Sequence, residues 1–258
     1  MATEPGVRSG PFASACRGVT EMYNLTFEFS IEKLVQAIAY FSNAGVRDLT
    51  KLKVAKLLYF ADKTHLLENG QPIIGDVYWC MDYGPVPSFA LNEMSAAISR
   101  PEIAVGADSD ANRFAQVLHV RTFFHYHPRF EARDGAYNPS VFSASELKAL
   151  DYTARTYGNK TAKELVTLTH MEPTWAVPNE GRATGSRALI TYDLFFRGAP
   201  ERSQRFLGKL VAEQFGVAVP LAGDADYRAF ANELMAYDFT PDDICESDVR
   251  RLARYNRV

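Results

Sequence analysis

Residues 51–70 read KLKVAKLLYFADKTHLLENG, and this stretch decides the fold. It predicts a helix from about Thr50 to Glu68, in which apolar residues cover most of the circumference. A helix that is apolar on nearly every side usually lies buried at the centre of a domain. Asn69 and Gly70 suit its C-terminal cap, because glycine adopts the left-handed conformation without steric penalty. We therefore expect the other elements to pack around this helix.

Further helices are predicted on both sides of this stretch. Apolar residues recur at helical spacing after Ser30, which is a suitable N-cap, and again over Ser88–Ser99. Capping boxes begin at Ser143 and Thr161, each with a glutamate three residues later. Three more helices are predicted over residues 200–215, over residues 225–237 and from Thr240 onward.

A strand is predicted over residues 73–81, followed by the turn Tyr83-Gly-Pro-Val-Pro87. Pro85 and Pro87 lack a backbone N–H, so we expect them to prevent a regular ladder and to stiffen the turn. Residues 114–131 predict one or two further strands, with a turn at Asp134-Gly135. Together these elements predict an α+β fold: a mainly helical domain with a small antiparallel sheet, plus a C-terminal helical extension.

Local composition divides the chain into three parts. Residues 1–22 are rich in glycine, proline, serine and alanine without periodicity, which predicts a disordered tail with Met22 as the true start. Residues 23–189 form the predicted domain, and residues 190–258 form the predicted helical extension.

The overall composition is ordinary for a globular protein, with 47% apolar residues, 23% charged residues and a net charge of −3. This charge argues against non-specific nucleic-acid binding, which needs a cationic surface. No apolar run is long enough to span a membrane, and no signal-peptide core is present. The three cysteines are far apart and form no CxxC pair, so we expect reduced thiols and a cytoplasmic protein.

Candidate catalytic and metal-binding residues are few. His119, His125 and His127 would share one face if they lay on a single strand, as a metal site requires, but surface histidines on a strand are the favoured interpretation. His170-Met-Glu172 lacks the Pro-Cys-x-x-Cys partner of the zinc deaminases. Cys80 has no sequence signal that pairs it with a base. We therefore expect no catalytic residue, no metal and no cofactor.

Two charge patterns suggest interaction surfaces. Lys53, Lys56 and Lys63 fall near one face of the central helix, either as a groove that grips a partner or as the solvated edge of a buried helix. Residues 224–248 carry eight acidic residues against one basic residue. This segment predicts either solvated helix faces or an acidic surface that attracts a basic partner.

Three separated motifs carry a resemblance to a known family. KLLYFADKTHLLENGQPI at residues 56–73 is followed by Tyr78 and by YGPVPS at residues 83–88. Leu168-Thr-His-Met-Glu-Pro-Thr-Trp175 comes third. In this order the motifs resemble those of the Panacea-domain family, whose best-known members are SocA-type antitoxins. The resemblance covers roughly residues 30–190.

The resemblance implies an antitoxin of a bacterial toxin–antitoxin system that neutralises a cognate toxin protein by direct binding. SocA-like members imply a further role, as adaptors that deliver the toxin to a cytosolic protease. We expect partner contacts from a rim formed by Lys56, Asp62, Lys63, Trp79, Tyr83, Pro85 and Pro87. Trp79 and Tyr83 are of the aromatic type that often anchors interfaces.

Two alternatives remain open at this level. A DNA-binding regulator of its own operon would use the arginines and lysines between residues 182 and 209, although no helix-turn-helix spacing is present and nucleic acid is not an expected partner. An enzyme with a metal-dependent site at the histidines is the other alternative.

Overall fold

The structure is a computed structural model that describes residues 24–99, 110–122 and 127–216. Several predictions lie outside these residues: the N-terminal tail with Met22, His125, the helices expected after residue 224 and the acidic segment 224–248. The described part is mainly helical with small antiparallel sheets, which confirms the predicted α+β class.

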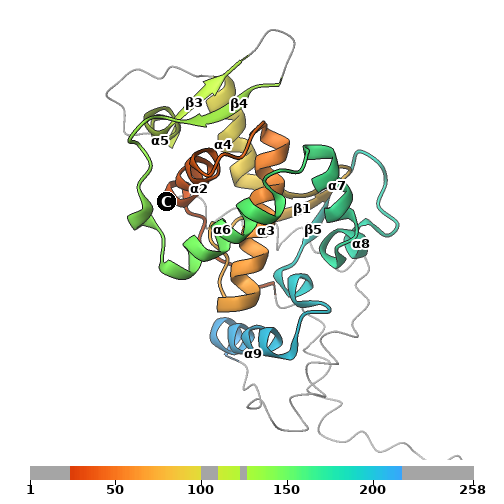
Figure 1. The fold of residues 1–258 in the computed structure, drawn as a ribbon. Coiled ribbons are helices and arrows are strands. Elements are labelled where there is room, and N and C mark those ends of the chain that lie inside the picture. The colour runs from red at the N-terminus through yellow and green to blue at the C-terminus, as the bar shows by residue number, and fades with distance from the viewer. Residues whose placement is uncertain (1–23, 100–109, 123–126, 217–258) are drawn as a thin grey trace, which may run out of the picture.

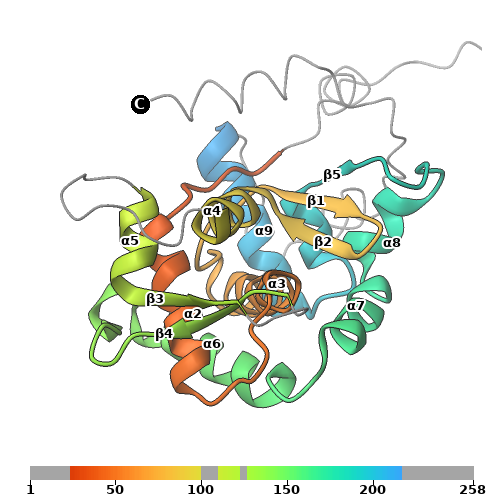
Figure 2. The ribbon, with the colours of Figure 1, turned by 90° about the horizontal axis from the view of Figure 1, so that it is seen from above.

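The central helix is α3, Lys51–Asn69, and it is surrounded by other elements as predicted (Figure 2). Its apolar residues from Val54 to Leu66 are buried in the core. The Thr50 hydroxyl accepts a hydrogen bond from the Lys53 backbone N–H, and Gly70 ends the helix in the left-handed conformation. Both ends therefore follow from local sequence signals.

Several of the other helices pack directly against α3 (Figure 1). Ser30 caps the N-terminus of one helix through its hydroxyl, and both predicted capping boxes, at Ser143 and Thr161, are formed. The helices are α2 (Ile31–Asn43), α4 (Ser88–Ser99), α5 (Asp110–Val117), α6 (Ala144–Tyr157), α7 (Ala162–His170), α8 (Pro173–Asn179) and α9 (Glu201–Phe215). Short 3₁₀ helices span Pro139–Val141 (η2) and Tyr192–Phe196 (η3).

A three-stranded antiparallel sheet has the order β2-β1-β5. Its strands are β1 (Tyr78–Met81), β2 (Gly84–Pro87) and β5 (Ala188–Ile190). The expectation that the prolines prevent a ladder is wrong, because Pro85 and Pro87 lie within β2. This strand is at the edge of the sheet, so only alternate backbone nitrogens face β1. The Ser88 N–H donates to the Val77 carbonyl, which places the nitrogens of Pro85 and Pro87 on the side that is not needed for pairing.

Residues 73–77, predicted as part of a strand, precede β1 as irregular chain. The second sheet is a hairpin of β3 (Leu118–Arg121) and β4 (Arg129–Ala132). His119 lies on β3 and His127 lies before β4, so the two do not share a single strand.

The predicted boundary between residues 189 and 190 falls inside β5, which pairs with β1. Beyond it, Phe195 in η3 packs in the core 5.5 Å from the ring of Tyr59 and 5.5 Å from that of Tyr78, and α9 contacts α3. The described residues after 189 are therefore part of the same core rather than a separate extension. The predicted boundary relied on local loop composition. Pairing between strands that are far apart in the sequence, such as β1 and β5, leaves no such local signal.

Candidate functional site

The three sequence motifs converge at Gly84, the first residue of β2. A Cβ atom at this position would lie 2.8 Å from the Lys56 Nζ of α3 and 2.5 Å from the Thr169 Oγ1 of α7. Gly84 also has a φ of 92°, which side chains other than glycine rarely adopt. Segments that are far apart in the sequence therefore form one junction, which we call the motif junction: α3, the β1–β2 hairpin and the α7–α8 corner.

Lys56 fixes the hairpin onto α3. Its side chain is fully buried, and its Nζ donates a hydrogen bond of 2.7 Å to the Pro85 carbonyl. Burial lowers the pKa of Lys56 from 10.5 to about 7, against a smaller opposing influence of the Cys80 thiol. The amine is thus a structural tie whose charged form is disfavoured by its surroundings.

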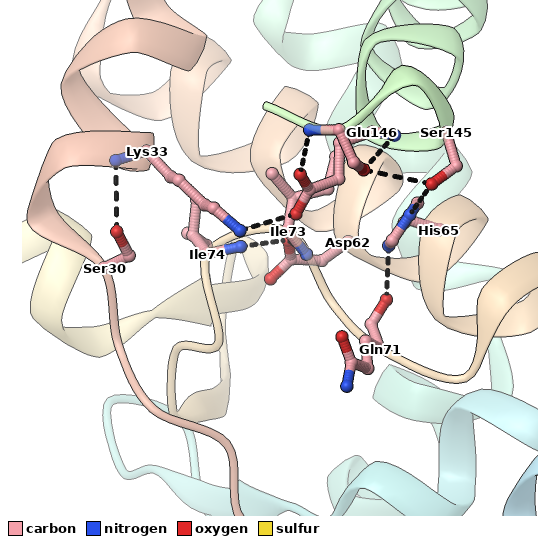
Figure 3. A network of polar contacts seen from close by, with 10 residues as sticks. Ser30, Lys33, Asp62, His65, Gln71, Ile73, Ile74, Ser145 and Glu146 are labelled. Atoms are coloured by element: carbon pink, nitrogen blue, oxygen red, sulfur yellow. Dashed lines mark hydrogen bonds and ion pairs between the residues drawn. The ribbon is translucent and has the colours of Figure 1, made fainter. Parts of the chain in front are cut away.

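Asp62 fixes the chain between α3 and β1 (Figure 3). One carboxylate oxygen accepts the Ile73 and Ile74 N–H groups at 2.8 and 2.9 Å. The other accepts the Tyr78 hydroxyl at 3.0 Å. Burial raises the pKa of Asp62 to about 7, and the three hydrogen bonds oppose this rise. The carboxylate thus satisfies the backbone N–H groups of residues 73–74, which lie outside any strand.

Polar contacts next to Asp62 join α6 to both α2 and α3 (Figure 3). The Lys33 ammonium pairs with Glu146 at 2.7 Å, and Glu146 also closes the capping box of α6. His65 contacts the Gln71 carbonyl through Nδ1 at 2.6 Å and Ser145 Oγ through Nε2 at 3.0 Å. Burial lowers the pKa of His65, which favours the neutral ring. This histidine therefore links α3 to α6.

Asp76 is a buried anchor that the sequence analysis did not single out. Its carboxylate accepts the Phe89 and Ala90 N–H groups at 2.9 and 2.7 Å, at the N-terminus of α4. Its backbone carbonyl accepts the Tyr192 hydroxyl at 2.7 Å. Burial raises the pKa of Asp76 to about 7. Because Asp76 lies twelve residues before α4, no local capping pattern could have revealed it.

The third motif closes the junction from the other side. The Trp175 indole N–H donates to the Met81 carbonyl at 2.8 Å, and its ring stacks on His170 at 3.7 Å. Thr174 shares a hydrogen bond of 2.5 Å with the Tyr59 hydroxyl of α3. Trp175 thus packs against the β1–β2 hairpin. Pro173 is the first residue of α8, a position where proline is favoured.

The predicted partner-facing rim is divided between interior and surface. It is wrong for Lys56, Asp62, Pro85 and Pro87, whose side chains are buried. Helical spacing could not reveal the burial of Lys56 and Asp62, because the groups that form hydrogen bonds with them come from distant segments.

Of the remaining predicted positions, Tyr83 is the most exposed, with 68% of its surface accessible. Lys63 pairs with Glu172 at the edge of the junction. Trp79 is partly covered by Arg187, whose guanidinium lies 4.4 Å from the ring centre. Met171 lies within the third motif and is 70% exposed, although the sequence analysis did not select it for the rim. Binding of a partner by these residues stays a prediction.

Two observations concern metal binding and nucleophilic chemistry near the junction. Among the residues that the structure describes, no group of three histidine, cysteine or acidic side chains is placed to hold a metal ion. Burial raises the pKa of Cys80 to about 11, which keeps the sulfur as a thiol, whereas nucleophilic attack requires the thiolate. No helix within the described ranges is both long and apolar enough to cross a membrane.

Comparison with known proteins gives one family. Residues 54–176 match the model of the family described as "Antitoxin SocA-like, Panacea domain". This range contains all three motifs and ends one residue after Trp175. Neither a curated protein nor a solved structure matches the chain. Over residues 54–176 the chain is therefore similar to the Panacea domain of SocA-like antitoxins.

Proposed function

We propose that this protein is the antitoxin of a toxin–antitoxin pair and that it neutralises a cognate toxin by direct protein–protein contact. The observation that carries the proposal is the family match over residues 54–176. The fold supports the proposal, since buried hydrogen bonds of Lys56 and Trp175 hold the β1–β2 hairpin in one place. A preformed surface binds with a smaller entropic penalty than a flexible one.

We place the toxin contact at the outer side of the motif junction. Tyr83, in the β1–β2 turn, and Met171, at the end of α7, are the most exposed large apolar residues of the described chain. Exposed aromatic residues on rigid turns are typical interface anchors, and methionine adapts to varied partner surfaces. Buried Lys56 and Gly84 would then act indirectly, by holding the turn that presents Tyr83.

A bacterial co-expression assay tests this proposal. The product of the adjacent open reading frame should stop growth when expressed alone, and this protein should restore growth. The double variant Tyr83→Ala/Met171→Ala should lose rescue while keeping its thermal stability. Tyr152→Ala is the matched control, because Tyr152 is 50% exposed on α6 but lies outside the three motifs. A harmless neighbour would overturn the antitoxin proposal, whereas undiminished rescue by the double variant would overturn only the placement of the contact.

The same cells distinguish the two modes of neutralisation. Direct sequestration should leave the toxin abundance unchanged on an immunoblot. Delivery to a protease, the adaptor role of SocA-like members, should lower toxin abundance and should disappear in a protease-deficient strain. Direct sequestration is the mode we propose, so a protease-dependent loss of toxin would contradict it.

The contribution of the C-terminal segment needs a cut that spares the core. Removing everything after residue 189 would take away buried Phe195 and Phe196 and helix α9, so loss of rescue would report only unfolding. Truncation after Gly216 keeps every helix and strand that the structure describes and removes the acidic residues of segment 224–248. If this segment attracts a basic toxin, truncation should slow association, and the slowing should shrink at high salt.

A further inference from the structure

A surface hollow of about 610 Å³ lies between the C-terminal ends of α2 and α6. Its size is within the range of ligand-binding pockets. Residues of the motif junction do not line it, and the antitoxin proposal makes no use of it. The hollow is therefore a separate feature with its own chemistry.

Two tyrosines form aromatic walls of the hollow. The rings of Tyr40 and Tyr137 are 6.0 Å apart with an interplanar angle of 64°, and both side chains are partly buried. The face of a tyrosine ring attracts cations, and it attracts a planar guanidinium in particular. Such walls favour a flat, positively charged group.

A carboxylate in the hollow has unused capacity. Asp151 accepts hydrogen bonds at Oδ1 from the Tyr40 hydroxyl at 3.4 Å and from Arg155 Nε at 3.0 Å. Within the described ranges its Oδ2 accepts no hydrogen bond. The pair with Arg155 is an exposed contact between neighbouring helical turns, and such pairs contribute little to stability. A second guanidinium can therefore share or replace it.

Helix α2 adds negative potential. Its last turn contains no basic residue, and Asn43, Ala44 and Gly45 at its C-terminal end line the hollow. The C-terminal end of a helix carries partial negative charge. The corresponding end of α6 is already satisfied from the buried side, where Lys53 Nζ donates to the Gly158 carbonyl at 2.8 Å. On the open side of the hollow, the negative potential comes from the α2 terminus and from Asp151, and Arg155 supplies the positive charge.

We propose that this hollow binds the arginine side chain of a partner polypeptide. The guanidinium would lie against the tyrosine rings and donate to Asp151 Oδ2. The hollow exceeds the needs of one side chain, and the exposed amides of Asn43 and Asn159 at its lining offer hydrogen bonds to the flanking peptide backbone. Arginine fits better than lysine, because its planar fork both stacks and bonds. This proposal is independent of the antitoxin proposal.

Peptide titration of the full chain tests it. The probe is the peptide Gly-Ser-Gly-Arg-Gly-Ser-Gly, and the matched peptide carries citrulline, which has nearly the same shape without the charge. The ring resonances of Tyr40 and Tyr137 should shift saturably with the arginine peptide, with a dissociation constant on the order of 1 mM for one anchored side chain. The citrulline peptide should shift them weakly.

Variants complete the test. Asp151→Asn should weaken binding by at least about threefold, in line with the loss of an exposed ion pair. Glu32→Gln is the control, because it removes an exposed carboxylate from the opposite end of α2. Equal shifts with both peptides, or equal binding by Asp151→Asn and wild type, would overturn the proposal. The peptide comparison uses the wild-type chain, so it decides the question even if a variant fails to fold.

Discussion

Lys56→Met should make the protein more stable at neutral pH. In the folded chain burial lowers the pKa of Lys56 from 10.5 to about 7. Between these two pH values the unfolded chain therefore binds more protons than the folded chain. The free energy of unfolding consequently falls as the pH is lowered from 10.5 to about 7. Each pH unit between the two values changes the free energy of unfolding by about 1.4 kcal/mol. At pH 7 the buried amine thus destabilises the fold by about 4 kcal/mol.

Methionine has a similar shape and no charge, so the substitution removes this penalty. It also removes the hydrogen bond to the Pro85 carbonyl, and leaving that buried acceptor without a partner costs about 1–3 kcal/mol. The net gain at pH 7 should be about 1–3 kcal/mol. At pH 9 the penalty in the wild type shrinks to about 2 kcal/mol, so the advantage of the variant should fall by about 2 kcal/mol.

Urea titrations of both proteins at pH 7 and pH 9 measure this difference. Asp62 and Asp76 titrate in wild type and variant alike, so their contributions cancel when one protein is subtracted from the other. Lys63→Met is the control on the same helix, and at either pH it should change stability by less than about 1 kcal/mol, because Lys63 forms a partly exposed ion pair. A Lys56→Met variant that is less stable than wild type at pH 7, or whose advantage does not change with pH, would refute the reasoning.

Three further predictions concern the same core. Gly84→Ala should lower the free energy of unfolding by more than about 2 kcal/mol, because the added Cβ would clash at the motif junction and the φ is positive. Gly135→Ala should lower it less, because the space around that Cβ position is open. Chemical denaturation of both variants measures the difference. Leu58→Ala should lower the free energy of unfolding by about 2–5 kcal/mol in the same assay, because Leu58 is buried; a value near zero would contradict its place in the core. Asp62→Asn should reduce the pH dependence of stability. The pKa of Asp62 is raised in the folded chain, so the wild type loses stability as the pH rises from about 4 to 7. Melting curves across this range should show a smaller loss in the variant.

Local signals in the sequence predicted the helices well. The caps at Ser30, Ser143 and Thr161 are formed as expected, because each depends on a side chain and a backbone N–H three residues apart. The helix over Ser88–Ser99 also has the predicted bounds. Its actual N-terminal partner, Asp76, was not predicted, since that contact depends on tertiary structure.

The candidate site was harder to predict for the same reason. Sequence placed three motifs in order but gave no distance between them, so the junction at Gly84 became visible only in the fold. Lys56 and Asp62 are charged residues on a helix, and charged residues are usually exposed. Their burial is compensated by Pro85, Ile73, Ile74 and Tyr78, all at least eleven residues away.

Direct binding of the purified toxin tests the central claim most directly. The full chain and the product of the adjacent open reading frame should elute together in size-exclusion chromatography, as a complex that the Tyr83→Ala/Met171→Ala variant fails to form and the Tyr152→Ala variant retains. Separate elution of wild type and toxin, under conditions in which the toxin is folded and active, would contradict neutralisation by direct contact.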